Sequence, residues 1–413
     1  MDTIVLHKLQ ELYSRREKHT FLVILYVLST IYIIFTPFLK KLTSIDELIV
    51  LALAIYSISY FHIYKKKEII ITFSILFIYL GYSLFQGINK PVAAFFDFIL
   101  FLKPFLCFFI CQQLGGRTSK KTRTYLKYLY IFLGAYCFII LPYINILYSN
   151  TAAYYPACIM CAISYLYFSK RNTKDWIIAL ILLSPGLFSI RAKFFTEYVF
   201  FVSIAFFLKK KIHFNMKWIF IFSILVSISI YISWAKFSHY FLYGDAEETA
   251  RTAIYVRSIN VLKDYMPMGS GYGTFGTEAA AKYYSPLYRK YGLEFVWGLR
   301  QEDYGGTRDF LKDTFYPVLA QFGILGIIFY FVFWWRRWKE SLLMEIELYK
   351  LFLIVFFIVS IQNIAANSFT SPTGVSYMMI LGLLINKNTN SQLKIIITKD
   401  SNCDSHEKTM GSV

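Results

Sequence analysis

The sequence is poor in charge and lacks the motifs of common soluble enzymes. Only 16% of its 413 residues are charged, whereas 57% are hydrophobic, and the mean hydropathy is +0.49. It contains no Walker phosphate loop and no HExxH zinc motif, and His239 is the only histidine between residues 236 and 313. These absences argue against a P-loop nucleotide site and a zinc-hydrolase site. We therefore expect no metal and no cofactor.

Cysteines are few, with none between residues 236 and 313 and five of the six in apolar stretches. Cys158 and Cys161 have the spacing of a metal or redox pair, but no partner ligands accompany them, and we interpret them as helix packing. No disulfide framework is implied. The first apolar stretch is long enough to span a membrane and lacks an A-x-A-like cleavage site, so no cleavable signal peptide is expected.

Acidic residues are also scarce, at 25 Asp and Glu against 43 Lys and Arg, which gives a formal charge of +18. Such an excess is compatible with nucleic-acid binding. Most of the basic residues, however, stand in short segments between apolar stretches, which is the pattern of a membrane topology signal. We therefore expect no nucleic acid as partner.

Long apolar stretches are what the sequence has in abundance, and they predict an all-α, polytopic transmembrane helix bundle. Residues 1–19 are amphipathic and predict a short helix on the inner membrane surface. The tail, residues 387–413, is polar. About twelve spans are predicted, at 20–38, 46–64, 68–86, 91–112, 124–148, 151–169, 174–190, 192–208, 217–235, 314–335, 347–365 and 372–386.

The basic residues alternate between the two sides of this bundle. The side of the N-terminus carries 21 Lys and Arg, whereas the short loops of the other side carry 5. The positive-inside rule therefore predicts that both termini are cytoplasmic. With spans one to nine in residues 20–235 and spans ten to twelve in residues 314–386, the long loop 236–313 lies outside.

The long loop is too patterned for a passive connector, with ten basic and ten acidic residues. Its most distinctive feature is a turn with alternating glycines at Gly269, Gly271 and Gly273, after Pro267. Such a turn is able to present backbone N–H groups to a phosphate or a sugar. Aromatic side chains of the loop are candidates to stack on sugar faces or, alternatively, to pack the loop; they are Tyr272, Tyr283, Tyr284 and Trp297.

Four cations and a carboxylate near the loop are further candidates. Arg191 and Lys193 stand in a tight turn between two spans, where a charge either faces a cavity or snorkels to headgroups. Arg251 and Arg257 suit diphosphate, because guanidinium binds oxygens bidentately, although the alternative is a solvated or headgroup-binding helix. Asp313 is able to accept a proton or, alternatively, to cap the helix that follows.

Two ionisable residues lie inside the fourth predicted span. Lys103 follows Asp97 by six residues, a spacing that does not pair them along one helix. A lysine at this depth is a functional candidate, and an ion pair with another span is the alternative.

The order of these motifs resembles the bacterial O-antigen polymerase and ligase family. Members carry a Ser-Arg-Ala-like motif at a tight outer turn, and this sequence has Ser189-Ile190-Arg191-Ala192, with an inserted isoleucine. Members also carry an arginine followed four residues later by an aromatic residue, as in Arg251 and Tyr255, and then a Pro-x-Gly-x-Gly turn. The loop closes with Lys312-Asp313 ahead of Gly323-Ile-Leu-Gly326, where the family has a polar pair and Gly-x-x-Gly.

The resemblance implies a glycosyltransferase of the bacterial inner membrane that joins oligosaccharide units carried on undecaprenyl diphosphate. It implies catalytic roles for Arg191, Arg251 and Asp313. Substrate-binding roles follow for Lys193, Arg257, Gly269, Gly271, Gly273, Tyr272 and Lys312. Membrane lipid and a chain-length regulator protein are the other partners implied.

Ligases of the family have a histidine where Lys312 stands, so the sequence favours a polymerase. The alternatives are a ligase that transfers polymer to lipid A-core and a flippase for lipid-linked oligosaccharide. A transporter more often shows internal repeats and charges along several spans.

Overall fold

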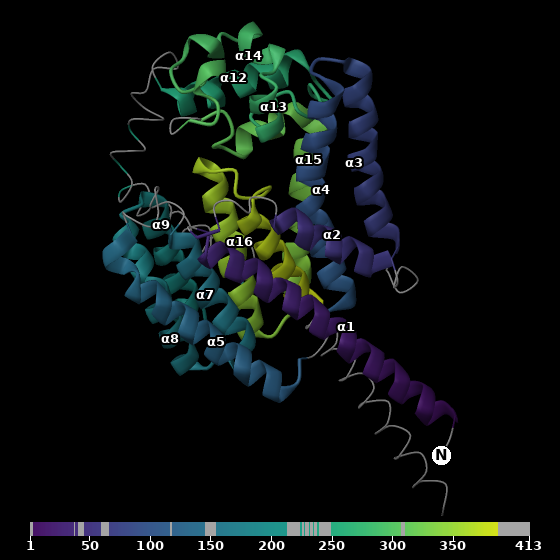
Figure 1. Ribbon diagram of the computed structural model, residues 1–413, viewed down its shortest axis with the longest axis vertical. Coiled ribbons are helices and arrows are strands. Elements are labelled where there is room, and N and C mark those ends of the chain that lie inside the picture. The colour runs from purple at the N-terminus through teal and green to yellow at the C-terminus, as the bar shows by residue number, and fades with distance from the viewer. Residues whose placement is uncertain are drawn as a thin grey trace, which may run out of the picture.

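The computed structural model describes residues 3–36, 38–39, 45–58, 66–115, 118–144, 154–212, 249–306 and 310–386, with single positions at 224, 227, 231, 234 and 238. Within this part of the chain all regular structure is helical, and no strand is present (Figure 1). The all-α class predicted from the sequence is therefore confirmed for the described residues.

The longer helices are α1 (Thr3–Ile34), α2 (Ile45–Ile58), α3 (Lys66–Gln86), α4 (Pro91–Leu114), α5 (Lys120–Ile139), α7 (Tyr154–Phe168), α8 (Thr173–Leu183), α9 (Ala192–Val202), α12 (Ala250–Asp264), α15 (Gly323–Ser341), α16 (Ile346–Ala365) and a final helix, Pro372–Asn386. The short elements are η2 (Leu141–Tyr143), η4 (Ser184–Ser189), η5 (Ser203–Phe207), α13 (Glu278–Lys282), α14 (Pro286–Lys290), η7 (Leu293–Phe295), η8 (Gln301–Asp303) and η9 (Tyr316–Phe322).

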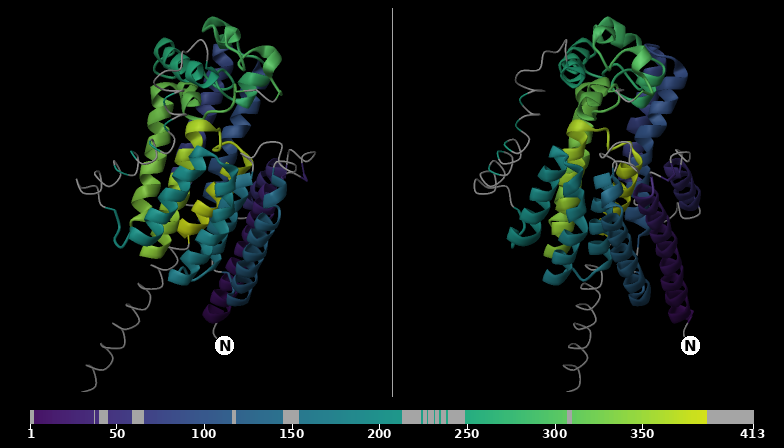
Figure 2. Two further views of the ribbon diagram at one scale, coloured as in Figure 1. Left: turned by 90° about the vertical axis from the view of Figure 1, so that its left-hand side faces the viewer. Right: turned by 60° about the vertical axis from the view of Figure 1, so that its left-hand side comes forward.

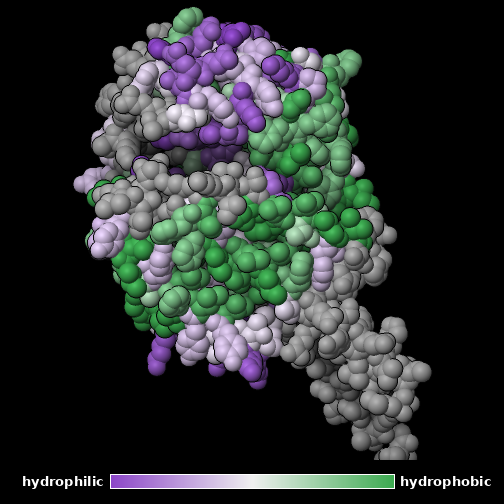
Figure 3. Space-filling view, viewed as in Figure 1, coloured by the Kyte–Doolittle hydropathy of each residue, from purple (hydrophilic) through white to green (hydrophobic). Residues whose placement is uncertain are grey.

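Within the described residues, four stretches of helix are long and apolar enough to cross a membrane, in α3, α4, η9 with α15, and α16. Large apolar side chains point outward on α2 and α3, such as Ile58, Phe77 and Ile78. Figure 3 shows an apolar belt between a hydrophilic cap and a more polar opposite end. Together these features indicate a helical membrane protein. The count of twelve spans stays a prediction, and most of span 217–235 and the tail 387–413 lie outside the described residues.

Helix α1 runs unbroken from Thr3 to Ile34. The prediction of a separate surface helix over residues 1–19 is therefore wrong in its boundary. Neither glycine nor proline occurs between Thr3 and Ile34, so nothing in the backbone breaks the helix where its composition changes from amphipathic to apolar.

The described part of the long loop folds into a cap with its own core at one end of the bundle (Figure 2). Ile254, Phe275, Tyr288 and Leu299 are among its buried residues. Helix α12 packs on η9, and α13 packs on α4, so the cap rests on two elements of the bundle. Below, the end of the bundle that carries this cap is called the loop end.

In each of the predicted spans 174–190 and 192–208, a short α-helix is followed by a segment of another helix type. Helix α8 continues into the 3-10 helix η4, and α9 continues into the π-helix η5. Asn172 and Asp175 form a capping box that fixes the start of α8. The two helices meet at Ile190, which places the start of α9 at the loop end.

Lys103, one of the two charged residues of α4, has partners inside the protein. The Lys103 ammonium donates to Asp46 Oδ2 at 2.7 Å and to Glu47 Oε1 at 2.8 Å, both on α2. Of the two interpretations of Lys103, the ion pair with another helix is therefore the one in the structure.

Cys158 and Cys161 are buried in α7 beside the Cys137 thiol of α5, in agreement with a packing role.

Candidate functional site

The turn before α9 is held in an unusual backbone conformation. Ile190 has φ of 50° and ψ of 36°, the left-handed region that β-branched residues rarely adopt. It is also the residue inserted into the Ser-Arg-Ala-like motif. Arg191 follows in an extended conformation as the N-cap of α9, and the Ser189 hydroxyl donates to the Gly186 carbonyl at 2.7 Å. The turn thus places Arg191 at the N-terminus of a helix.

Lys193 lies in the first turn of α9 and is half-buried. Its Nζ stands 5.3 Å from the centre of the Tyr155 ring, a cation–π contact with α7. Among the described residues it has neither an ion pair nor a hydrogen bond. Its charge is acted on through space by four charged side chains: Arg191, Arg251, Asp313 and Glu197.

Arg251 reaches this group from the first turn of α12. One of its terminal nitrogens lies 3.0 Å from Asp313 Oδ2, and its guanidinium carbon lies 5.5 Å from the Phe310 ring centre. Both side chains of the ion pair are partly exposed, at 25% and 36%. One turn further along α12, the Tyr255 hydroxyl donates to the Ile364 carbonyl at 2.7 Å, which ties α12 to the end of α16.

The structure therefore gathers the predicted site residues Arg191, Lys193, Arg251 and Asp313 at the loop end, from three segments far apart in sequence. Below, these four residues are called the charged cluster. In the common view of Figures 1 and 3, the surface is hollowed between the cap and the apolar body, with α12 above the hollow and α9 below it.

Asp313 does not cap a helix. Helix η9 begins at Tyr316 with Phe315 as its N-cap, and α15 begins only at Gly323. The capping interpretation of Asp313 is therefore wrong, and its carboxylate is engaged by Arg251 instead.

Lys312 points to a different partner. Its Nζ lies 2.6 Å from Glu278 Oε2 on α13 and 5.4 Å from the Tyr304 ring centre. Glu278 also accepts a hydrogen bond of 2.7 Å from the Tyr304 hydroxyl. These contacts join parts of the cap to each other. Arg257 is half-buried on α12 and makes neither a hydrogen bond nor an ion pair with the described residues.

The glycine turn is buried, and its amides are used inside the protein. The Gly271 N–H donates to the Gln321 carbonyl at 2.8 Å, and the Gly273 N–H donates to Asp97 Oδ2 at 2.7 Å. The Tyr272 N–H donates to the Ser83 hydroxyl at 2.7 Å. The expectation that these amides are available for a phosphate or a sugar is corrected: a carboxylate of α4, with Ser83 and Gln321, takes the place of that anion.

The three glycines are required by conformation and close packing. Their φ angles are +83° at Gly269, +88° at Gly271 and +71° at Gly273. A Cβ on Gly269 would lie 2.3 Å from the Gly323 nitrogen, and a Cβ on Gly323 would lie 2.4 Å from the Gly269 nitrogen. The glycine turn and the Gly-x-x-Gly motif therefore pack directly against each other, so their role in the structure is to seat the cap on the bundle.

The Tyr272 side chain is not available to stack on a sugar. It is 1% exposed, and its ring packs against Phe98 and Phe322, with centroid distances of 5.8 Å and 5.0 Å. Tyr284 is also buried in the core of the cap. The substrate-stacking role expected of Tyr272 is therefore corrected to a packing role.

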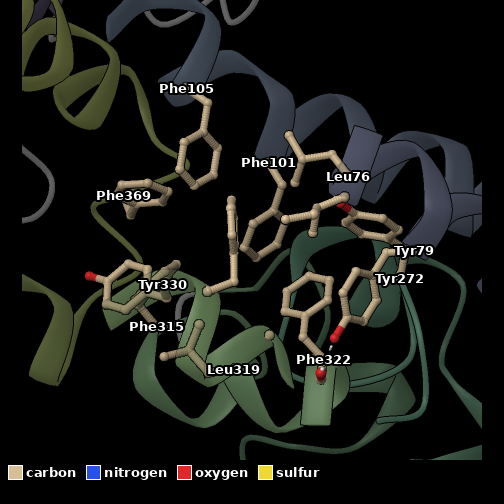
Figure 4. A pocket seen from close by; sticks show the side chains of 13 residues that line it. Leu76, Tyr79, Phe101, Phe105, Tyr272, Phe315, Leu319, Phe322, Tyr330 and Phe369 are labelled. Carbon is tan, nitrogen blue, oxygen red and sulfur yellow. Dashed lines mark hydrogen bonds between the residues drawn. The ribbon is translucent and has the colours of Figure 1, made fainter. Parts of the chain in front are cut away.

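A small apolar cavity of about 30 Å³ lies beneath the glycine turn (Figure 4). Phe101 of α4, Phe315, Tyr330 of α15 and Phe369 contribute to its wall. Its lining is almost entirely apolar, so it has no group suited to recognise a phosphate. The chemistry of the loop end therefore belongs to the charged cluster and not to this cavity.

Sequence reasoning missed Glu197. This residue lies on α9, one turn after Lys193, and is only 1% exposed. The signal in the sequence is a single carboxylate inside an apolar stretch whose composition predicts a plain span.

No protein-family model, no curated protein and no solved structure matches the chain. Its function is therefore inferred from its own residues.

Proposed function

We propose that this chain is a membrane glycosyltransferase of the O-antigen polymerase type. Its substrates are oligosaccharide units carried on undecaprenyl diphosphate. A hydroxyl oxygen of the acceptor sugar forms a bond to the anomeric carbon of the donor chain. The bond from that carbon to the diphosphate oxygen breaks, the lipid diphosphate leaves with the electron pair, and the hydroxyl proton passes to a carboxylate.

The observation that supports this proposal is the composition of the charged cluster. Three cations meet there with Asp313 as the carboxylate in direct contact, so the group has an excess of positive charge. The N-terminus of α9 adds its partial positive charge, because the first backbone N–H groups of a helix have no partner within it. Such a site favours an anion with several oxygens, and preorganised cations stabilise the charge that develops on a leaving diphosphate.

The contact between Arg251 and Asp313 suggests how binding and chemistry are coupled. The Arg251 guanidinium donates to Asp313 Oδ2 at 3.0 Å. A diphosphate competes for the same guanidinium, because Arg binds phosphate oxygens bidentately. Its binding releases Asp313, which then serves as the base for the acceptor hydroxyl.

The rest of the proposal concerns the surroundings of the site. The prenyl chain of the substrate lies in the bilayer beside the apolar belt, so the diphosphate reaches the protein near the membrane surface. We place the loop end on the outer face of the bacterial inner membrane, with both termini cytoplasmic, and we include a chain-length regulator protein as a partner. Nucleotide is not required on that face, because the lipid-linked donor is already activated.

Reconstitution in liposomes tests the proposed reaction. Purified protein is mixed with the undecaprenyl-diphosphate-linked repeat unit of its own host, and the products are separated by gel. We expect a ladder of polymer lengths and release of undecaprenyl diphosphate, and we expect both to be lost in Arg191→Ala. No ladder with correctly folded protein would contradict the polymerase. Transfer that occurs only after lipid A-core is added would indicate the ligase, and movement of the unit across the bilayer without bond formation would indicate a transporter.

A further inference from the structure

Glu197 is a buried carboxylate on α9, only 1% exposed. Neither oxygen accepts a hydrogen bond of standard geometry from a described residue. Three other helices contribute polar groups around it: Tyr155 of α7, Gln362 of α16 and Tyr377 of the final helix. The Gln362 amide acts on the Glu197 carboxylate and also donates to the Tyr377 hydroxyl at 3.1 Å.

Stability does not explain such a group. Burial of a carboxylate without hydrogen bonds disfavours the folded state, and a neutral side chain at the same place would avoid that penalty. Unpaired ionisable groups inside membrane bundles are retained mainly where function requires the charge. Glu197 is therefore expected to serve something other than packing.

Lys193 is the cation on the same helix as Glu197. It stands four residues before Glu197 on α9, so the two side chains lie on the same face, about 6 Å apart along the helix axis. The ammonium contacts the Tyr155 ring, but it has neither a hydrogen bond nor an ion pair among the described residues. A flexible lysine in this place is able to turn toward Glu197 on the bundle side or toward an anion on the side of the charged cluster.

The charge balance explains why both groups are needed. Arg191 and Arg251 repel the Lys193 ammonium, whereas Glu197 and Asp313 attract it. Asp313 is already engaged by Arg251 at 3.0 Å. Glu197 is therefore the carboxylate that remains to offset the repulsion before an anionic substrate arrives.

We propose that Glu197 is a positioning residue of the diphosphate site and acts through Lys193. This inference rests on the function proposed above. Before substrate binds, the Glu197 carboxylate holds the ammonium at the start of α9, beside the two arginines. When the lipid diphosphate binds, the ammonium turns to the phosphate oxygens. Lys193 is then in place to bind the substrate, because Glu197 has kept it near the two arginines that repel it.

A double-mutant cycle on lipid binding tests this role. The affinity for undecaprenyl diphosphate is measured in nanodiscs for the wild type, Glu197→Gln, Lys193→Met and the double variant. We expect each single substitution to weaken binding on the order of tenfold. The double variant should bind no more weakly than the single variant with the lower affinity, because the effects of coupled residues are not additive. Glu197→Asp, which keeps the charge, should recover most of the affinity. Additive effects in the double variant, or wild-type affinity in Glu197→Gln, would overturn the proposal.

Thermal unfolding of the same proteins separates positioning from a structural role. Glu197→Gln replaces a buried unpaired carboxylate by a neutral amide, so we expect an unfolding temperature equal to or above that of the wild type, together with weaker binding. A lower unfolding temperature with unchanged affinity would mean that Glu197 serves the fold alone.

The wild-type protein shows which of the two proposals has failed. If it neither binds the lipid nor forms polymer, the proposed function is wrong and this role fails with it. If the wild type binds and polymerises, whereas Glu197→Gln behaves like it, only the role of Glu197 is wrong.

Discussion

The Asp97 carboxylate accepts a hydrogen bond of 2.7 Å from the backbone N–H of Gly273, although the two residues belong to different parts of the molecule, α4 and the cap. The same oxygen accepts a second hydrogen bond, at 2.9 Å, from the Gln321 amide of η9. Asp97 is fully buried. This carboxylate therefore joins the bundle, the glycine turn and η9 at one point, and it helps to set where α12 presents Arg251.

Gly273→Ala should destabilise the protein more than Gly292→Ala. Both glycines have positive φ, at +71° and +69°, which an alanine adopts at a penalty of about 1 kcal/mol. Only at Gly273 would the new Cβ also press on backbone, 2.7 Å from the Ala93 carbonyl, and this overpacking adds about 1–3 kcal/mol. Thermal unfolding in detergent measures the difference. Equal losses would show that the close packing of the turn on α4 is not maintained in the protein.

Arg251→Ala should slow polymerisation by roughly 100- to 1,000-fold, the usual effect of removing one charge-stabilising donor. Arg251→Lys should recover little, because lysine keeps the charge and loses the bidentate fork. Arg300→Ala is the matched control, since Arg300 is exposed in the same cap and pairs only with Glu302 among the described residues. Polymer lengths are compared by gel at equal amounts of membrane protein. Normal lengths in Arg251→Ala would remove Arg251 from the mechanism.

Lys103→Met should reduce stability and leave the activity of the folded protein unchanged. The change leaves Asp46 and Glu47 side by side without their cation, and loss of one partner of a buried ion pair typically destabilises by about 3–5 kcal/mol. Adding Asp46→Asn should restore part of the loss. Unfolding temperature and polymer formed per folded molecule are the two measurements. Normal stability with lost activity would return Lys103 to the functional candidates.

The topology is testable with a membrane-impermeant thiol reagent in intact cells. Gln301→Cys is exposed in the cap, and Lys121→Cys is exposed at the start of α5, at the opposite end of the bundle. The five described native cysteines are buried, so only Cys403, outside the described residues, needs replacement by serine. We expect labelling at position 301 and not at 121. The reverse pattern would place the charged cluster in the cytoplasm, where lipid-linked polymer is not assembled in this account.

The helical class and the individual members of the charged cluster were predictable because each depends on local signals. Apolar stretches predict helices, and the chemistry of Arg191, Lys193, Arg251 and Asp313 near predicted membrane boundaries marks them as site candidates. The structure adds their proximity, which depends on how α9 and α12 pack. No local pattern in the sequence encodes that packing.

The function of the glycine turn was not predictable from the turn itself. Alternating glycines with positive φ can bind a foreign anion or an internal one, and the sequence signal is the same. The choice is made by Asp97 and Gln321, whose sequence positions lie far from the turn. The continuity of α1 across the predicted boundary at residue 19 was not predictable for a different reason. A change of composition does not end a helix when no glycine or proline interrupts it.

The central claim is that this chain polymerises lipid-linked repeat units, and deletion of its gene followed by gel analysis of the lipopolysaccharide tests it most directly. Without a polymerase, transport and ligation of single units continue, so we predict a lipid A-core band shifted upward by one repeat unit, with the ladder restored by the wild-type gene and not by Arg251→Ala. An unshifted core with polymer accumulating on its lipid carrier would contradict the claim and indicate a ligase, and an unchanged ladder in a strain that makes this polymer would contradict both.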